Sequence, residues 1–253
     1  MNDLGSQWEY DVLGVYNSDR PGQLSNYFRF LEENINHIPG DIAEFGVYRG
    51  ASILATGLLL KKLGSSKKIY GFDSFGGFPS YHSNDDLGLF DSLFEQNRIS
   101  KEHWNSVKKN IHFRQTLTKQ HIDAKNISSS GDFSDNSLPL LKAKIELLAL
   151  DNIVLIEGDF AKTATAVNDR PLMAALVDCD LFGGYRDCLP FIWRNLSLGG
   201  YIYLDEYFSL KFPGAKIATD LFFESRRDKP QQHKHTAGDF ERWFVRKIYG
   251  DLP

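Results

Sequence analysis

The sequence predicts an α/β fold built on a doubly wound, mostly parallel sheet. Short apolar segments with strand character recur along the chain, segments of helical periodicity lie between them, and glycine turns join strand to helix. This alternation is typical of a parallel sheet covered by helices on both faces. The chain has 253 residues, of which 42% are hydrophobic and 25% charged, as in one folded domain with an insertion. We therefore expect residues 1–253 to form a single domain.

The expected elements follow one another in a regular order. Apolar side chains recur at helical spacing in the leading segment, and Pro39 and Gly40 close that helix. In the first half we expect a leading helix within residues 24–40, a strand at 41–47, a glycine turn at 46–50, a helix at 52–63 and a strand at 68–72. In the second half we expect helices at 138–150, 185–196 and 214–227, and strands at 153–156, 174–177, 201–204 and 240–248.

Residues 80–136 interrupt this order. They are far longer than the roughly two to six residues that usually connect such elements, so we interpret them as an insertion. Ser100 is expected to cap a helix over residues 100–111 within it. Because ligands of open α/β sheets bind outside the carboxyl ends of the strands, an insertion leaving that edge is expected to act as a substrate lid. The alternative is a surface segment with no role in binding.

Charge and composition exclude several classes of protein. The formal net charge is −4, without a long basic run, so we expect no nucleic-acid partner. The most apolar stretch, residues 53–60, is far shorter than the roughly 18 residues of a membrane span, and residues 1–10 do not resemble a secretory signal. A cytoplasmic location without membrane association is therefore expected. The two cysteines, Cys179 and Cys188, are too few for a disulfide framework and are expected to be reduced.

The first strand-to-helix turn has the sequence Glu44-Phe-Gly-Val-Tyr-Arg-Gly50, and Asp73 ends the next strand. A dinucleotide fingerprint needs a glycine where the backbone meets the pyrophosphate, whereas here Val, Tyr and Arg separate the two glycines. S-adenosylmethionine, which has a ribose but no phosphate, suits this turn better. Asp73 would accept hydrogen bonds from the ribose hydroxyls, and Glu44 would hold the loop or the cationic end of the cofactor. A tight turn without any ligand is the alternative.

A second motif, Gly158-Asp159-Phe160, follows the strand at 153–156. A carboxylate beside an aromatic ring suits adenine, whose amino group donates hydrogen bonds while its face stacks. Asp159 is equally well explained as the cap of the helix that follows.

Acidic residues end two further strands. Asp178-Cys179-Asp180 follows the strand at 174–177, and Asp205-Glu206 follows the strand at 201–204. Neighbouring strands lie about 4.8 Å apart, so these carboxylates would repel one another unless a cation or a proton intervened. Magnesium prefers oxygen ligands of this kind. The alternative is a set of solvated strand ends or helix caps.

These motifs together resemble the macrocin O-methyltransferase-like family, whose members methylate sugar hydroxyls of macrolide and aminocoumarin antibiotics. The resemblance extends in motif order over residues 24–248 and is weakest in the insertion. It implies a Rossmann-like class I methyltransferase domain, S-adenosylmethionine as methyl donor, magnesium at the acidic strand ends and a homo-oligomer. The motifs are Glu44-Phe-Gly-Val-Tyr-Arg-Gly50, Asp73-Ser-Phe-Gly-Gly-Phe-Pro79, Gly158-Asp-Phe160, Asp178-Cys-Asp-Leu-Phe182, Leu198-Gly-Gly200, Asp205-Glu-Tyr207 and Pro213-Gly-Ala-Lys216.

The resemblance assigns roles to individual residues. The metal ligands would be Asp178, Asp205 and Glu206. The cofactor-binding residues would be Glu44, Gly46, Tyr48, Gly50, Ser52, Asp73, Ser74, Phe75, Asp159, Phe160 and Asp178. This chain departs from the family pattern at Glu206, which is usually Asp, at Cys179, which is usually Gly, and at Phe182-Gly183-Gly184, where the family has Tyr-Glu-Ser/Thr.

The function expected from these residues is an S-adenosylmethionine-dependent, magnesium-assisted O-methyltransferase of natural-product biosynthesis. Its acceptor would be a small-molecule hydroxyl compound such as a glycoside, because a vicinal diol chelates a metal well. The expected general base is Asp178, with His233 and His235 as rivals. The alternatives are a non-catalytic S-adenosylmethionine-binding or scaffold protein of the same fold and an NAD-dependent oxidoreductase.

Overall fold

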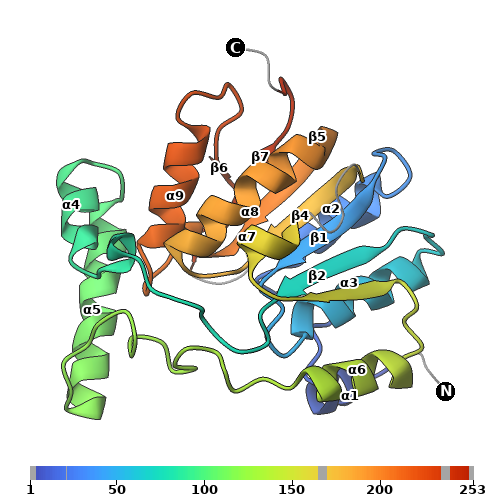
Figure 1. Cartoon of the computed structure of the whole chain (residues 1–253), viewed down its shortest axis with the longest axis horizontal. Helices are drawn as coiled ribbons and strands as arrows, with labels where there is room; N and C mark the ends of the chain where they lie inside the picture. Colours follow the sequence, from blue (N-terminus) through green and yellow to red (C-terminus); the bar gives the residue numbers. More distant parts are fainter. Residues whose placement is uncertain (1–3, 21, 165–169, 235–239, 251–253) are drawn as a thin grey trace.

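A computed structural model describes residues 4–20, 22–164, 170–234 and 240–250 (Figure 1). Within this part of the chain, seven strands form one sheet in the order β3-β2-β1-β4-β5-β7-β6. Strands β1 to β5 pair in parallel, whereas β7 runs antiparallel to β5 and β6 antiparallel to β7. The strands are β1 (Asp41–Phe45), β2 (Ile69–Asp73), β3 (Ile153–Glu157), β4 (Leu172–Val177), β5 (Leu196–Leu204), β6 (Gln231–Gln232) and β7 (Trp243–Arg246).

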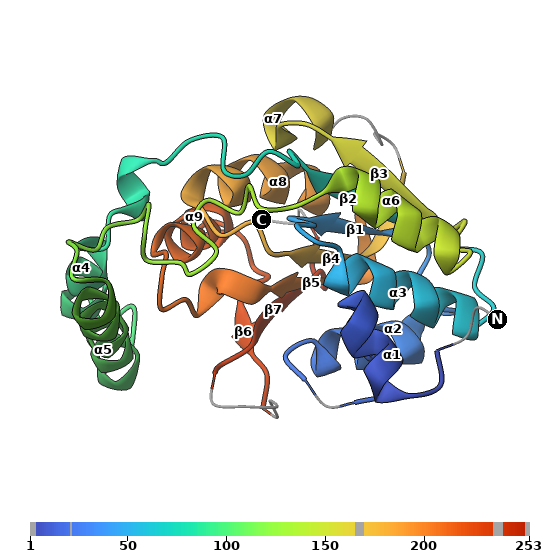
Figure 2. The same cartoon turned by 90° about the horizontal axis from the view of Figure 1, so that it is seen from below.

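Helices cover both faces of the sheet (Figure 2). One face packs against α1 (Gln7–Leu13), α2 (Ser25–Asn34), α3 (Ala51–Lys62) and α6 (Leu138–Leu147). The other packs against α7 (Phe160–Thr163), α8 (Phe182–Asn195) and α9 (Gly214–Phe223). In β4, Ala174 and Leu176 pack toward the first layer and Ala175 and Val177 toward the second, which explains why this strand is apolar at every position. The predicted doubly wound α/β fold is confirmed.

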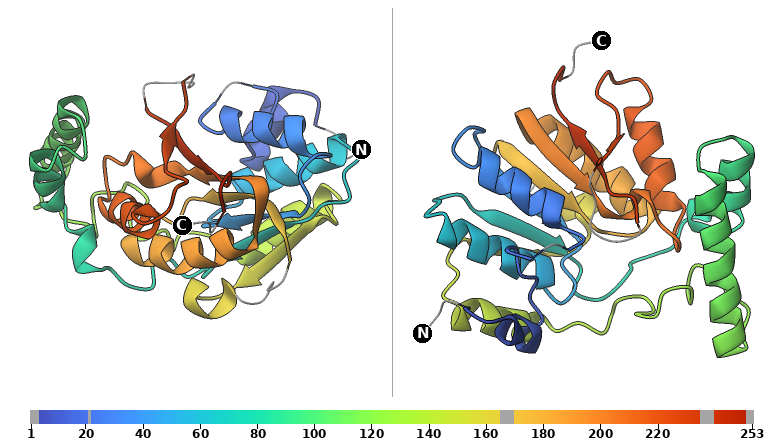
Figure 3. Two further views of the ribbon diagram at one scale, coloured as in Figure 1. Left: turned by 90° about the horizontal axis from the view of Figure 1, so that it is seen from above. Right: turned by 180° about the vertical axis from the view of Figure 1, so that it is seen from behind.

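The insertion contains η1 (Ser83–Asp85), α4 (Leu89–Glu95) and α5 (Lys101–Thr118). Helices α4 and α5 form a pair that lies beside α9, at one end of the molecule (Figures 1 and 3). Their apolar side chains pack with Leu210 and Ile217, and Arg98 forms an ion pair of 2.6 Å with Asp220 of α9. Ser100 caps α5 as predicted, since its hydroxyl accepts a hydrogen bond from His103 N at 3.0 Å.

Most predicted elements are present with shifted ends. The expected helix at 214–227 ends at Phe223, where Lys229 Nζ lies 2.7 Å from the carbonyl oxygens of Phe223 and Glu224. The expected strand at 240–248 is confined to Trp243–Arg246, and α5 extends seven residues beyond the expected helix at 100–111. None of the helices in the described ranges has the length and apolar character of a membrane span.

Candidate active site

A cavity of about 640 Å³ opens at the carboxyl edge of the parallel strands. Its walls are the loops after β1, β2, β3 and β4, together with α1, residues 77–80, Phe133 and Lys144. Of the predicted cofactor residues, those that line it are Gly46, Tyr48, Ser52, Asp73, Ser74, Asp159, Phe160 and Asp178. Glu44, Gly50 and Phe75 do not line it. The parallel sheet therefore brings four motifs, one after each of the strands β1, β2, β3 and β4, to one cavity.

Both glycines of the first turn are required by close packing of the backbone. Gly46 has a φ of 91°, and a Cβ there would lie 1.9 Å from the carbonyl oxygen of Asp178. Gly50 has a φ of 86°, and its Cβ would lie 2.3 Å from Cδ1 of Leu141 on α6. Only glycine meets both demands at once. Residues 46–50, which we call the glycine loop, can therefore pass directly over the end of β4.

Asp73 holds this glycine loop in place. Its Oδ2 accepts hydrogen bonds from the backbone N–H groups of Val47 and Tyr48 at 2.7 and 2.8 Å. Its Oδ1 accepts one from Phe75 N at 2.6 Å. A carboxylate has about four acceptor positions, so one remains for a ligand in the cavity. Tyr48 and Phe75 both have a positive φ, near 50°, which marks a constrained backbone beside the cavity.

Glu44 lies beneath the loop, not in the cavity wall. Its Oε1 accepts a hydrogen bond of 2.5 Å from the Ser52 hydroxyl, and its Oε2 is buried without a partner among the described residues. Burial raises the pKa of Glu44 to about 8, while the Ser52 hydrogen bond opposes this shift. Glu44 therefore supports the loop as a largely protonated side chain near neutral pH.

Asp159 is the N-cap of α7, because its Oδ1 accepts a hydrogen bond of 3.1 Å from Ala161 N. The capping interpretation of this residue is therefore correct, and Asp159 also lines the cavity. Phe160 packs edge to face on Phe45 with ring centroids 5.3 Å apart. An apolar ring and a carboxylate thus lie side by side in the cavity wall.

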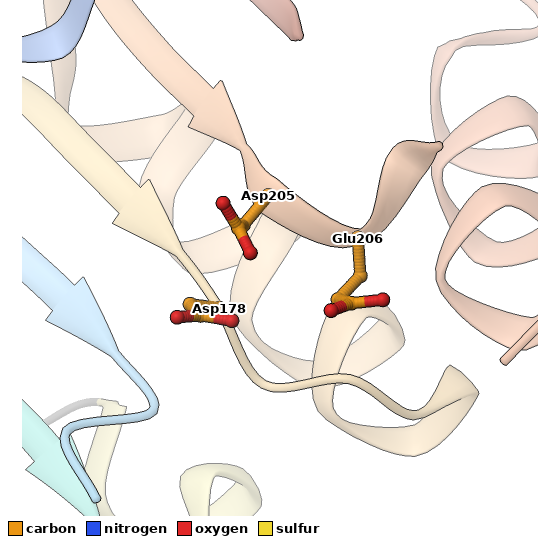
Figure 4. Close-up of side chains that lie close together, drawn as sticks. All are labelled: Asp178, Asp205 and Glu206. Atoms are coloured by element: carbon orange, nitrogen blue, oxygen red, sulfur yellow. The ribbon is translucent and has the colours of Figure 1, made fainter. Parts of the chain in front are cut away.

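Three carboxylates converge beside the cavity (Figure 4). Asp178 follows β4, and Asp205 and Glu206 belong to η3 (Asp205–Tyr207), which follows β5. One oxygen of each lies within 4.8 Å of the others, and Oδ1 of Asp205 is buried without a hydrogen-bond partner in the described residues. Burial, together with the charge of Asp205, raises the pKa of Asp178, and burial and the charge of Glu206 raise that of Asp205 to about 6. An all-oxygen set with unsatisfied charge fits a hard divalent cation.

Sequence reasoning missed the cation beside this cluster. Lys211 Nζ lies 3.3 Å from Oε1 of Glu206 and 3.5 Å from Oδ1 of Asp180. Asp180 lines the cavity and has a pKa raised to about 7 by burial, which Lys211 opposes. The loop that carries Lys211 is held from the insertion, where His103 Nε2 lies 2.7 Å from the carbonyl oxygen of Ser209. The sequence offers one signal for this cation, a lysine five positions after Asp205-Glu206. That spacing alone does not show where the lysine lies, because its loop is held by a contact with the insertion.

His233 lies apart from the cavity. Its Nε2 is 2.8 Å from the hydroxyl of Tyr201, and its ring stacks on Phe244 with centroids 4.2 Å apart. Burial lowers its pKa to about 4, and Arg29 adds to this effect. The structure therefore does not bring His233 to the carboxylates. His235, the other predicted rival base, lies outside the described residues.

The strand order is that of a Rossmann-like class I methyltransferase fold, as in the solved methyltransferase structures to which the chain is similar. Residues 22–152 match the sequence model of the family Macrocin-O-methyltransferase (TylF), and the chain belongs to this family. The predicted family is therefore confirmed.

Two curated relatives are each 25% identical to this chain over the part that aligns. Demethyldecarbamoylnovobiocin O-methyltransferase of Streptomyces niveus is 25% identical over 202 residues, covering 79% of this chain and 64% of the relative. Mycinamicin III 3''-O-methyltransferase of Micromonospora griseorubida is 25% identical over 189 residues, covering 73% and 62%. The chain thus spans less than two thirds of the length of either curated relative. The solved structure of the O-methyltransferase NovP aligns with a TM-score of 0.63 at 18% identity, covering 89% of this chain and 79% of that one.

Proposed function

We propose that the protein is an S-adenosylmethionine-dependent, magnesium-assisted O-methyltransferase that acts on a hydroxyl of a sugar or another small natural-product acceptor. The observation that supports this most strongly is the convergence of Asp178, Asp205 and Glu206 beside the cavity under the glycine loop. Family membership supports the reaction class. The names of the two relatives, which describe O-methylation of demethyldecarbamoylnovobiocin and of mycinamicin III, support the acceptor class.

The cavity suits the proposed cofactor in size and lining. Its volume falls within the range of about 300 to 1,000 Å³ that is usual for small-molecule sites. Asp73 retains an acceptor position for ribose hydroxyls, and Asp159 and Phe160 offer a carboxylate and a ring to adenine. When bound, S-adenosylmethionine supplies an electrophilic methyl group. The Val-Tyr-Arg run between the glycines leaves no bare backbone for a pyrophosphate, which disfavours an NAD-dependent oxidoreductase.

The three converging carboxylates would hold the magnesium ion. When bound there, the ion would supply Lewis acidity that lowers the pKa of an acceptor hydroxyl. Asp178 both lines the cavity and belongs to the cluster, which supports it as the group that would accept the hydroxyl proton. A non-catalytic protein would have no need to keep these mutually repelling acids together.

The insertion would act as the lid of the acceptor site. Phe78, two residues before the insertion, and Phe133, near its end, line the cavity and pack on each other with ring centroids 5.0 Å apart. Phe78 N also donates a hydrogen bond of 2.9 Å to the carbonyl oxygen of Asp132. Apolar rings at the cavity edge would exclude water from the methyl transfer and position the acceptor.

Substituting Asp178 by Asn tests the proposed chemistry. Transfer of a labelled methyl group from S-adenosylmethionine to a panel of vicinal-diol glycosides should fall by about 100-fold or more, as for loss of a general base. The affinity for S-adenosylhomocysteine, measured by calorimetry, should change little, because the glycine loop and Asp73 remain. Asp151→Asn, at an exposed turn before β3, is the matched control. Full turnover by Asp178→Asn would exclude Asp178 as the base.

A further inference from the structure

Lys144 of α6 reaches the cavity from the helix that follows the insertion. Its Nζ lies near the end of α1, only 3.8 Å from the position that a Cβ on Gly14 would take. The side chain is half-buried, and it forms no ion pair or side-chain hydrogen bond with the residues that the structure describes. Its ammonium group is therefore free to pair with an anionic group of a ligand in the cavity.

The other charged groups around this end of the cavity do not neutralise Lys144. Arg49 is itself paired with Asp135 at 2.5 Å, and its positive charge acts against Lys144. Arg186, the other cationic lining residue in the described ranges, is paired with Asp187 at 2.7 Å. The pKa of Lys144 is lowered by burial and by Arg49, as expected where no anion compensates the ammonium group.

The same end of the cavity contains the start of α3. Ala51 and Ser52 line the cavity, and Gly50, the N-cap, offers no side chain to the free N–H groups of the first turn. The N-terminus of this twelve-residue helix therefore adds partial positive charge beside Lys144. By contrast, Asp73 and Asp159 make the strand-end wall of the cavity acidic. Asp11 of α1 also lines the cavity at the end near Lys144, where its Oδ1 accepts a hydrogen bond of 2.7 Å from Nε2 of Gln7. Lys144 and the start of α3 are thus the positive groups at this end that have no partner among the described residues.

We propose that Lys144 binds the carboxylate of the amino-acid moiety of the cofactor. This inference rests on the proposed function, which makes S-adenosylmethionine the ligand of the cavity. The ammonium group of Lys144 has three donors, and a carboxylate placed between it and the start of α3 forms charge-assisted hydrogen bonds at a protected position. With adenosine at the acidic, aromatic wall, the amino-acid end lies toward α1 and α6. Lys144 thereby distinguishes the intact cofactor from analogues without a free carboxylate.

The test compares S-adenosylhomocysteine with its carboxyl methyl ester, which keeps the adenosine and the ammonium group but has no carboxylate charge. Dissociation constants for both are measured by calorimetry with the unchanged protein and with Lys144→Met, Lys144→Arg and Lys142→Met. Lys142 is an exposed lysine of the same helix and provides the matched control.

The unchanged protein and Lys142→Met should prefer the acid over the ester by about tenfold or more, a difference of about 1.4 kcal/mol per tenfold. Lys144→Met should lose this preference because it binds the acid more weakly and the ester unchanged, and Lys144→Arg should restore part of it. An unchanged preference in Lys144→Met would overturn this inference alone. Failure of the unchanged protein to bind S-adenosylhomocysteine would overturn the proposed function, and the inference with it.

Discussion

Glu44 illustrates how much one residue beneath the site can affect the whole protein. It lies on a central strand, is fully buried, and has one oxygen without a partner among the described residues. Burial raises its pKa from the ordinary 4.5 to about 8. The folded protein therefore keeps a proton that the unfolded chain loses between these two values. The stability that this group contributes is fully present below pH 4.5 and is lost as the pH rises toward 8.

Replacing Glu44 by Gln should remove this pH dependence. The free energy of unfolding of the unchanged protein should fall relative to that of Glu44→Gln as the pH rises from about 5 to about 8, because only the former has a proton to lose. Urea denaturation at several pH values, with chelator present, measures the difference. Glu157→Gln, at the exposed end of β3, should parallel the unchanged protein. Parallel curves for Glu44→Gln would show that Glu44 does not titrate in this range.

Single residues could be predicted from the sequence where their position along a strand determines their place in space. The sequence predicts that Asp178, Asp205 and Glu206 lie together because they follow the ends of two strands of one parallel sheet, and in the structure one oxygen of each lies within 4.8 Å of the others. Lys211 could not be predicted, because its position depends on contacts between its loop and α5. The position of His233 could not be predicted either, because it lies in a turn without regular structure and is fixed by contacts with Tyr201 and Phe244.

At the scale of elements, helices and strands could be predicted from the sequence wherever a regular pattern of apolar residues extends over the whole segment. The helices at α2, α3, α5 and α8 and the parallel strands all follow from the sequence pattern. Helix α1 was missed because Trp8 and Val12 are exposed and leave it a weak apolar face. Strand β6 has two residues and exists only through its pairing with β7. Elements that depend on tertiary contacts therefore could not be predicted.

The insertion contacts the glycine loop through Asp135, and we expect this contact to restrain the cavity. Asp135 forms an ion pair of 2.5 Å with Arg49, and its carboxylate accepts a hydrogen bond of 2.5 Å from the hydroxyl of Tyr48. Both partners line the cavity. Asp135→Ala should therefore speed the dissociation of S-adenosylhomocysteine several-fold. It should change the stability by only about 0 to 1 kcal/mol, because the ion pair is exposed.

Stopped-flow displacement and urea denaturation measure the two effects of Asp135→Ala separately. The matched control is Asp19→Ala, which removes an ion pair of 2.6 Å with Lys62 at nearly the same exposure but away from the cavity. Dissociation should be unaffected in Asp19→Ala. Equal dissociation rates in both variants would mean that Asp135 does not restrain the cavity.

At the scale of the whole molecule, the site is assembled from nearly the full length of the described chain. The walls come from α1, the loops after four strands, both ends of the insertion and α6, while the carboxylates follow β4 and β5. The parallel order β3-β2-β1-β4-β5 makes this possible, because it places every one of these strand ends on the same edge. The sheet thus determines where the site forms, and the segments inserted between its elements determine what the site can hold.

The carboxylates that follow β4 and β5 should make the binding of a divalent cation depend on pH. Asp178, Asp205 and Glu206 converge, and Lys211 forms ion pairs with both Glu206 and the neighbouring Asp180. Because the pKa is raised to about 6 for Asp205, to about 7 for Asp180 and also for Asp178, the metal-free cluster holds protons near neutral pH. A divalent cation must displace them, so its affinity should rise between about pH 6 and pH 8.

Calorimetric titration with Mg²⁺ in two buffers of different ionisation enthalpy measures both the affinity and the protons released. Proton release should be largest near pH 6 and should decrease at higher pH, as Asp205 and then Asp180 lose their protons without the ion. Asp205→Asn should bind Mg²⁺ at least about tenfold more weakly, because it removes a ligand whose Oδ1 has no other partner among the described residues. Tight binding without proton release would mean that these carboxyl groups are already ionised in the folded protein. Their mutual repulsion would then have to be relieved by Lys211 alone or together with Arg242, whose charge lowers the pKa of Asp205.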